Sequence, residues 1–389
     1  MYPTISDLLQ DLLGFHFPLP IQTFGFFMAL SFAAAYWFTN QELIRKENAG
    51  LLLPQTKLMT INKPIEISEY VVHVALYALI GFKLLEMVLD YDALVKNPQT
   101  FILSTKGNFL GALIGAAYGY YEKYKEALKL KGKSPSQESV TIKAHEQMGN
   151  ILGLAAVGGI LGAKIFHNLE NLNEFAANPL EALFSFSGLT FYGGLIVAAV
   201  LIIRYTHKNG IAWYHMVDSA AVGLMMAYGI GRIGCHLSGD GDWGIENFAA
   251  QPHLISFLPD WFWAYQYPNN VINEGITIPG CVGNHCYMLP NPVFPTPLYE
   301  ALISIAIALV LWAVRKQFKI AGQLFFTYLI CNGMERFLIE KIRVNNNYHL
   351  FGLAFTQAEL ISFTLMIAGI IGLWWTKKNA QTNKALILR

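Results

Sequence analysis

The chain has 389 residues, of which 54% are hydrophobic and only 14% are charged. Globular domains usually carry about 25% charged residues, so the composition excludes an ordinary soluble protein and predicts an integral membrane protein. The formal net charge is +1, and we expect no nucleic-acid partner.

Stretches of roughly 20 apolar residues, each long enough for a membrane-spanning helix, recur along the chain. Nine of them lie at about residues 22–40, 70–89, 101–121, 149–167, 187–203, 216–234, 297–314, 322–340 and 355–375. The third is the weakest because it contains Lys106. The first 40 residues contain no Lys or Arg, so a cleavable signal peptide is not expected and the first span is retained. We predict an all-α, polytopic helical bundle.

Lys and Arg are distributed unevenly between the two sets of loops. One set holds 19 of them, in segments 41–65, 121–148, 204–212, 315–320 and 376–389, whereas the alternate set holds 4. Because cytoplasmic loops are enriched in basic residues, we predict that the N-terminus lies outside and the C-terminus inside.

Two loop regions are unusual. Residues 120–148 are polar and rich in lysine, and they form either an amphipathic segment near anionic headgroups or a solvated loop. Residues 236–297 form a small extracytoplasmic head segment with many aromatic residues and no Lys or Arg. Within it, Cys281 and Cys286 form a disulfide, remain free thiols, or bind a metal together with His285.

Two arginines lie within predicted spans. Arg232 lies near the end of the apolar stretch 216–234, where a glycine-rich loop begins. A charged side chain inside a membrane is by default evidence of a functional site. Arg336 is followed at i+4 by Glu340, so the two share a helix face, while Glu335 points elsewhere. Arg336 and Glu340 neutralise each other, or the two arginines together hold a phosphate, which guanidinium groups bind bidentately.

Two further motifs lie at the predicted outer ends of spans. Tyr192-Gly193-Gly194 contains a glycine pair, which either lets a lipid approach the backbone or allows close helix packing. Phe294-Pro-Thr-Pro-Leu-Tyr-Glu300 sets the start of a helix and places Glu300 about one turn inside it.

In this order, these motifs resemble the prolipoprotein diacylglyceryl transferase family. The family signature Gly-Arg-Ile-Gly-Asn-Phe-x-Asn-Gly-Glu-x-x-Gly is similar to Gly231 to Gly244, with one extra residue. The other matching motifs are Phe24-Gly25, Gly162 to Lys164, Asn178 to Glu181, Leu189 to Leu195, Pro295 to Leu302 and Arg336 to Arg343. The resemblance divides the chain into an N-terminal segment with the first span (1–59), an inserted hairpin with the Lys-rich segment (60–148), a transferase-like membrane core (149–375) and a cytoplasmic tail (376–389).

The resemblance implies a multi-pass enzyme of the bacterial cytoplasmic (inner) membrane. It would transfer a diacylglyceryl group from phosphatidylglycerol to the lipobox cysteine of an exported prolipoprotein. The product is a thioether and the leaving group is glycerol-1-phosphate. No cofactor or metal is expected, because the phospholipid is itself the activated donor.

The resemblance also implies a set of site residues. Arg232 and Arg336 would bind the phosphate, with Glu340 orienting Arg336. The expected substrate-binding residues are Phe24, Gly193, Gly194, Gly231, Gly234, Cys235, Asp240, Gly244, Tyr299 and Glu300.

The sequence departs from the family at the proton acceptor. The family histidine is Tyr192, and a phenol is a poor base at neutral pH unless neighbouring arginines lower its pKa. Either Tyr192 or His236 would then assist removal of the thiol proton. The signature Asn-Phe is Cys235-His236, and the signature Glu is Asp240 or Asp242. Either His236 has become the catalytic base or it is structural. The rival functions are a catalytically altered or inactive paralogue that binds anionic phospholipid in a lipid-binding or assembly role, and a transporter, for which no repeat is evident.

Overall fold

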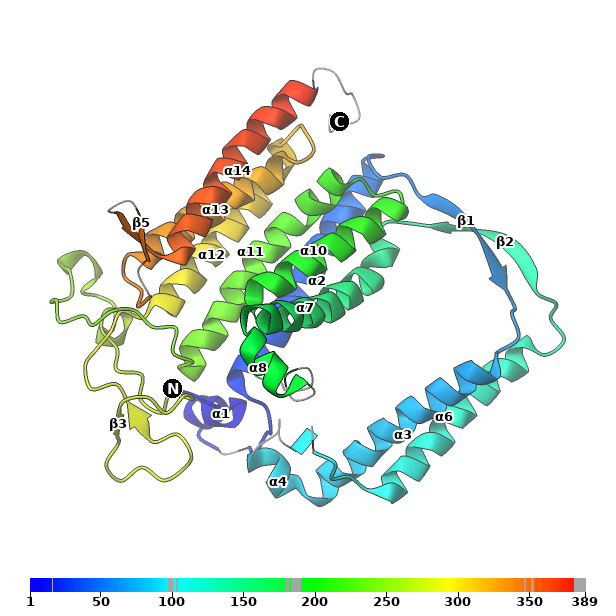
Figure 1. The fold of residues 1–389 in the computed structure, drawn as a ribbon, viewed down its shortest axis with the longest axis horizontal. Helices are drawn as coiled ribbons and strands as arrows, with labels where there is room; N and C mark the ends of the chain where they lie inside the picture. The colour runs from blue at the N-terminus through cyan, green and yellow to red at the C-terminus, as the bar shows by residue number, and fades with distance from the viewer. Residues whose placement is uncertain are drawn as a thin grey trace.

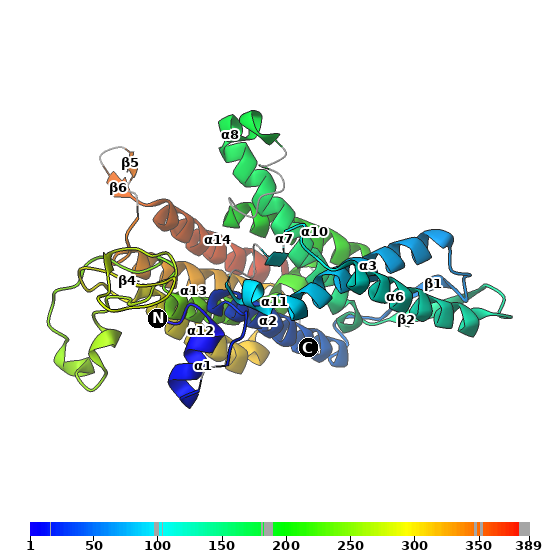
Figure 2. The same cartoon turned by 90° about the horizontal axis from the view of Figure 1, so that it is seen from below.

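The computed structural model describes residues 1–15, 17–96, 101–102, 104–179, 182, 190–345, 348–350 and 353–380. Within these residues the chain is mostly helical, and a long helix overlaps each of the nine apolar stretches (Figure 1). The long helices are α2 (Thr23–Asn48), α3 (Ile67–Leu89), α6 (Phe109–Leu130), α7 (Met148–Glu170), α10 (Phe191–Lys208), α11 (Trp213–Ser238), α12 (Thr296–Val314), α13 (Gln323–Glu340) and α14 (Gln357–Ala380). The shorter helices α1 (Ile5–Leu13) and α8 (Leu172–Ala177) project from opposite faces of the bundle (Figure 2), and α4 (Tyr91–Lys96) follows α3.

Five helices in this described part of the chain are long and apolar enough to cross a membrane. They are α3, α7 with the turn before it, α11, α12 with the turn after it, and α14. The other four long helices do not meet the same limits of hydropathy and charge. The predicted helical class and multi-pass character are therefore supported, with five candidate spans.

The bundle is built around α11, which packs against α2, α12 and α13. Ala221, Val222 and Met225 of α11 are completely buried in one apolar cluster with Ala308 of α12 and Leu324 of α13. Helix α13 packs along α14, and α7 packs along α10. The helix that carries Arg232 is therefore enclosed by other helices.

The helices α3 and α6 form a hairpin that lies apart from the bundle in Figure 1. Strands β1 (Gln55–Ile61) and β2 (Ser136–Ile142) join it to the bundle as an antiparallel ribbon, with Gln55 opposite Ile142 and Ile61 opposite Ser136. The two helices approach so closely that a Cβ on Gly115 would lie 2.1 Å from the carbonyl oxygen of Tyr77.

The structure differs from the sequence prediction around this hairpin. Asn108 caps α6 by accepting hydrogen bonds from the amides of Leu110 and Gly111, so the helix begins after Lys106 rather than near residue 101. The Lys-rich segment 120–148 is partly helical and partly extended, rather than only a loop. It continues α6 as far as Leu130 and then contributes β2.

The head between α11 and α12 has its own small core, formed by Trp243, Tyr267, Leu289 and Val293. Its strands β3 (Ile276–Thr277) and β4 (Tyr287–Met288) pair antiparallel, as do β5 (Tyr348–Leu350) and β6 (Leu353–Phe355) after α13. Cys281 and Cys286 form a disulfide with their Cα atoms 5.6 Å apart, which confirms the first of the three alternatives.

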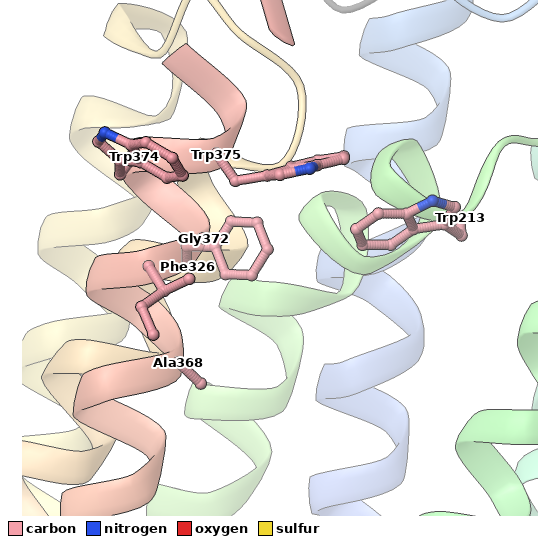
Figure 3. A pocket seen from close by; sticks show the side chains of 7 residues that line it. Trp213, Phe326, Ala368, Gly372, Trp374 and Trp375 are labelled. Carbon is pink, nitrogen blue, oxygen red and sulfur yellow. The ribbon is translucent and has the colours of Figure 1, made fainter. Parts of the chain in front are cut away.

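Tryptophans gather at the end of the bundle opposite the head. Trp213, at the start of α11, faces Trp375 of α14 with ring centroids 5.9 Å apart (Figure 3). Together with Trp374 and Phe326 they line an apolar hollow. Lys377 and Lys378 follow on α14. Tryptophans close to lysines at the end of a membrane helix are typical of a membrane–water interface.

The close approach within the hairpin predicts that Gly115→Leu lowers the stability of the protein, because the added side chain must force α3 and α6 apart. Overpacking of this kind costs about 1–3 kcal/mol or more. Thermal unfolding in detergent measures the effect. Gly153→Leu on α7 is the matched control, because nothing lies within 4 Å of its added Cβ. Equal unfolding temperatures for the two variants would contradict the prediction.

Candidate functional site

Three arginines converge on the carboxylate of Glu300, in the first turns of α12. Arg232 Nε, near the end of α11, lies 2.5 Å from Glu300 Oε2. Arg336 Nη1, on α13, lies 2.8 Å from Oε1, and Arg343 Nη1 lies 3.0 Å from the same oxygen. Glu300 is completely buried. The structure thus brings together Arg232, Arg336 and Glu300, which the sequence singled out, and adds Arg343.

Two further carboxylates complete the charge balance. Asp242 pairs with both Arg232 and Arg343, and Glu340 Oε2 lies 3.3 Å from Arg336 Nη2. Burial alone would raise the pKa of Asp242, but Arg232 and Arg343 outweigh it and hold that pKa below its ordinary value. We call these three arginines and three carboxylates the arginine cluster. Its six charges sum to zero.

Backbone contacts hold the loop after α11 against the segment before α12 and the segment after α13. The amide of Gly244 donates to the carbonyl of Phe294 at 2.9 Å, and the amide of Ile245 donates to the carbonyl of Ile342 at 2.9 Å. A Cβ on Gly244 would lie 2.4 Å from the Ile342 carbonyl oxygen, so a larger residue would push the strands of chain apart. These contacts bring Asp242 and Arg343 together.

Several other predicted residues lie beside the cluster. Cys235 Sγ is 3.7 Å from Arg232 Nη1. Gly234 packs against α2, where a Cβ would meet Phe27 at 2.8 Å and the backbone of Phe24 at 3.6 Å. Gly231, by contrast, has open space around it. Phe24 and Gly234 therefore fix α2 against the arginine end of α11.

Asp240 and Tyr299 act mainly within the loop and the head. Asp240 Oδ1 accepts from the amide of Asp242 at 3.3 Å, and burial raises the pKa of its carboxyl. Tyr299 donates to the carbonyl of Phe262 at 2.6 Å. The ligand atoms of Cys235, Asp240 and Asp242 lie within 4.8 Å of one another. A cation there would adjoin the guanidinium groups that hold Asp242, so we assign no metal to them.

The glycine pair supports helix packing. A Cβ on Gly193 would lie 2.3 Å from Phe166 Cβ, and one on Gly194 would lie 2.7 Å from the Gly159 carbonyl oxygen, both on α7. Tyr192 lies in the first turn of α10, whose main neighbour is α7, and it is partly exposed. Leu180, Glu181 and Leu189, which belong to two of the resembling motifs, lie outside the described residues.

His236 lies one helical turn beyond Arg232 and is buried against the head. Its Nδ1 is 3.2 Å from the hydroxyl of Tyr267, and its ring also contacts Tyr265 and Trp261. Three aromatic neighbours are consistent with a packing role. The i, i+4 spacing also places the imidazole on the same side of α11 as Arg232.

Arg343 and Tyr228 are the members of the site that the sequence did not single out. Tyr228 donates to Glu300 Oε2 at 3.1 Å and lies one turn before Arg232. Arg343 lies in the polar segment after the apolar stretch 322–340, so the charge pattern alone marks it as a loop cation. Its place at the end of the motif from Arg336 to Arg343 was the available signal.

Comparison with known proteins shows which family the part of the chain that carries the arginine cluster is similar to. The sequence pattern of the prolipoprotein diacylglyceryl transferase family matches residues 127–375, more than half of the chain and all of the arginine cluster. A phosphatidylglycerol–prolipoprotein diacylglyceryl transferase of Shouchella clausii is 28% identical over 277 residues, covering 70% of this chain and 87% of the relative. One of Bacillus anthracis is 29% identical over 226 residues, covering 58% and 74%, and one of Halalkalibacterium halodurans is 26% identical over 220 residues, covering 56% and 68%.

The charge balance predicts that Glu300→Gln destabilises the protein. The substitution keeps the side-chain volume but leaves buried guanidinium charge without its shared partner, which costs about 3–5 kcal/mol. Unfolding in detergent gives the free-energy change. The control is Glu359→Gln on α14, whose partner Lys341 is exposed, and whose loss costs about 1 kcal/mol or less. Similar losses in both variants would argue against a cluster organised by Glu300.

Proposed function

Because the chain belongs to the prolipoprotein diacylglyceryl transferase family, we propose that it transfers a diacylglyceryl group from phosphatidylglycerol to the lipobox cysteine of an exported prolipoprotein. The reaction forms a thioether and releases glycerol-1-phosphate. Three relatives that carry this activity in their names support the proposal, although each is less than 30% identical to this chain.

The observation that carries the proposal is the arginine cluster. Guanidinium groups bind phosphate bidentately and stay charged when they are buried. The side chains of Arg232 and Arg336 are 16% and 21% exposed, so an anion can reach both of them. The arginine side chains are therefore oriented before the reaction, and they would stabilise the negative charge that develops on the departing phosphate.

Two of the three carboxylates of the arginine cluster, Asp242 and Glu300, differ in exposure. The Asp242 side chain is 31% exposed and lies on a loop, whereas Glu300 is completely buried on a helix. We propose that the lipid phosphate replaces Asp242 on Arg232 and Arg343, while Glu300 stays and holds the three guanidinium groups together. Glu340 keeps Arg336 oriented through the i, i+4 contact.

The acceptor thiol must lose its proton before it attacks, because the thiolate is the nucleophile. Of the two predicted bases, we propose His236 rather than Tyr192. His236 is on the same helix as Arg232, one turn closer to the head, whereas Tyr192 is on α10. The sulfur then forms a bond to the diacylglyceryl carbon, and the electron pair of the broken C–O bond passes to the phosphate.

We further propose that all nine long helices cross the bacterial cytoplasmic membrane, with the N-terminus outside and the C-terminus inside. The head would then lie on the outer side of this membrane, where the protein would bind exported prolipoproteins. The tryptophans and lysines at the far end of α14 fit the inner interface. The unit formed by β1, α3, α6 and β2 would be an insertion in the family core, and residues 376–389 a cytoplasmic tail.

Transfer of radiolabelled lipid from phosphatidylglycerol to a lipobox peptide tests the function and the site together. Arg343→Gln is expected to lower the transfer rate by about 100-fold or more, because one preorganised donor to the phosphate is lost. Lys341→Gln is the matched control, since its side chain is 57% exposed and pairs with Glu359 rather than with a carboxylate of the arginine cluster. Phosphatidylglycerol binding without any thioether product from the unsubstituted protein would indicate a lipid-binding role instead.

The proposed base predicts that His236→Ala abolishes transfer while phosphatidylglycerol binding persists. His236→Phe separates the two roles of the ring, because it restores aromatic packing against Tyr267 without a proton acceptor, and it should also be inactive. His285→Ala in the same head serves as the control for loss of an imidazole. Unchanged transfer in either His236 variant would exclude His236 as the base.

A further inference from the structure

A second group of buried charges lies at the end of the bundle opposite the arginine cluster. Glu42 of α2 is completely buried, and two arginines from different elements contact its carboxylate. Arg45 Nη2, one turn further along α2, lies 2.9 Å from Glu42 Oε2. Arg315 Nε, directly after α12, lies 2.5 Å from Glu42 Oε1. One buried carboxylate thus joins two guanidinium groups, as Glu300 joins three at the other end.

The neighbouring charges leave one cation unmatched. Lys46, one turn beyond Glu42, has its Nζ 3.8 Å from Asp218 Oδ2 of α11, and both side chains are almost completely buried. That pair neutralises itself, so Glu42 supplies one negative charge to two arginines. Among the described residues, no other carboxylate pairs with Arg45 or Arg315. With three cations and two carboxylates, this group has a net charge of +1, whereas the arginine cluster has none.

Each of the two arginines also keeps a nitrogen for a ligand. Arg45 directs Nε and Nη2 to the same oxygen of Glu42. Arg315 directs Nε to Glu42 and donates from Nη1 to the carbonyl of Trp312. In the described part of the chain, Arg45 Nη1 and Arg315 Nη2 have no hydrogen-bond partner. The two side chains are 26% and 16% exposed, so an anion can reach both of them.

Aromatic rings beside Arg315 place this group near lipid headgroups. Its guanidinium lies over Trp312, with Cζ 3.4 Å from the ring centroid. Trp312 in turn contacts the half-exposed Trp37 of α2, with ring centroids 5.8 Å apart. Tryptophans at the ends of membrane helices commonly lie at the level of the headgroups. Under the proposed membrane arrangement, the unmatched charge therefore faces the inner headgroup layer.

We propose that Arg45 and Arg315 form a second anion site, which binds a phosphate group. Opposite oxygens of one carboxylate hold the two guanidinium groups, so they are close enough for one phosphate to bridge them. Guanidinium groups suit this ligand because they donate paired hydrogen bonds to phosphate oxygens. A phosphate with one negative charge would cancel the remaining +1 while Glu42 stays in place. The phosphate belongs either to the headgroup of an anionic phospholipid or to a free phosphate compound.

This site is separate from the proposed transfer reaction. Asp218, beside the second site, and Arg232, in the arginine cluster, are about 20 Å apart along α11. A phosphate bound at Arg45 and Arg315 therefore cannot reach the arginines of the cluster. The second site would hold its ligand whether or not the protein transfers a diacylglyceryl group.

Calorimetric titration of the full-length protein in dodecyl maltoside tests the site. The probe is short-chain phosphatidic acid, and phosphatidylcholine with the same chains is the lipid control. Arg45→Gln and Arg315→Gln should each weaken one binding event by about 10-fold or more, because a charge-assisted contact with the phosphate is lost. Lys316→Gln is the matched control, since Lys316 follows Arg315 directly, is exposed and carries the same charge. Arg343→Gln should leave this event unchanged, because Arg343 belongs to the arginine cluster.

A second variant separates loss of the site from loss of the fold. Arg315→Lys keeps a positive charge for Glu42 but removes the additional nitrogen that the phosphate would meet, so binding should weaken while the unfolding temperature changes little. A parallel titration with inorganic phosphate identifies the source of the ligand. Binding of phosphatidic acid alone would support a lipid headgroup, and binding of both probes would support a free phosphate compound. Identical titrations for the unsubstituted protein and all variants of Arg45 and Arg315 would overturn the inference.

Discussion

The carboxylate of Glu300 lies completely buried among three guanidinium groups, and the positions of the surrounding elements depend on it. Removing such charges from water costs several kcal/mol for each ion, and the cost is offset only when every charge meets a well-placed partner. Arg232 comes from α11, Arg336 from α13 and Arg343 from the segment that follows. A single side chain on α12 therefore fixes how these elements meet, and it does so at the end of the bundle that carries the head.

The same arrangement separates a permanent partner from an exchangeable one. Glu300 is enclosed by helices, whereas Asp242 lies on a partly exposed loop tied down by the contacts of Gly244 and Ile245. Under the proposed function, an incoming phosphate meets guanidinium groups that are already oriented, so little reorganisation is needed as the reaction proceeds. The free energy needed to bring the three guanidinium groups together is supplied when the protein folds, and not again in each turnover.

The sequence predicted the helices well because apolar stretches of membrane length leave few alternatives. It also singled out Arg232, Arg336 and Glu300, since each lies in a motif of the family, but it did not predict that both arginines contact Glu300. Arg343 and Tyr228 were missed because their roles arise only when α11, α12 and α13 pack together. The β1–β2 ribbon was missed for a similar reason: its two strands are far apart in the chain, and neither has the strong alternation that marks a buried strand. The glycine pair at Gly193 was singled out from its family motif as a place where a lipid could approach. In the structure it packs against the neighbouring helix α7.

The ribbon that joins the α3–α6 hairpin to the bundle also bears on how such a chain can change over evolution. Its first and last residues, Gln55 and Ile142, are paired partners, so the chain leaves the bundle and returns to it at one point. Directly opposed residues in an antiparallel pair have Cα atoms about 5 Å apart, a gap that a very short turn can close. Removing the whole segment would therefore put little strain on the helices that hold Glu300. A change on the surface of the hairpin would likewise leave the arginine cluster as it is.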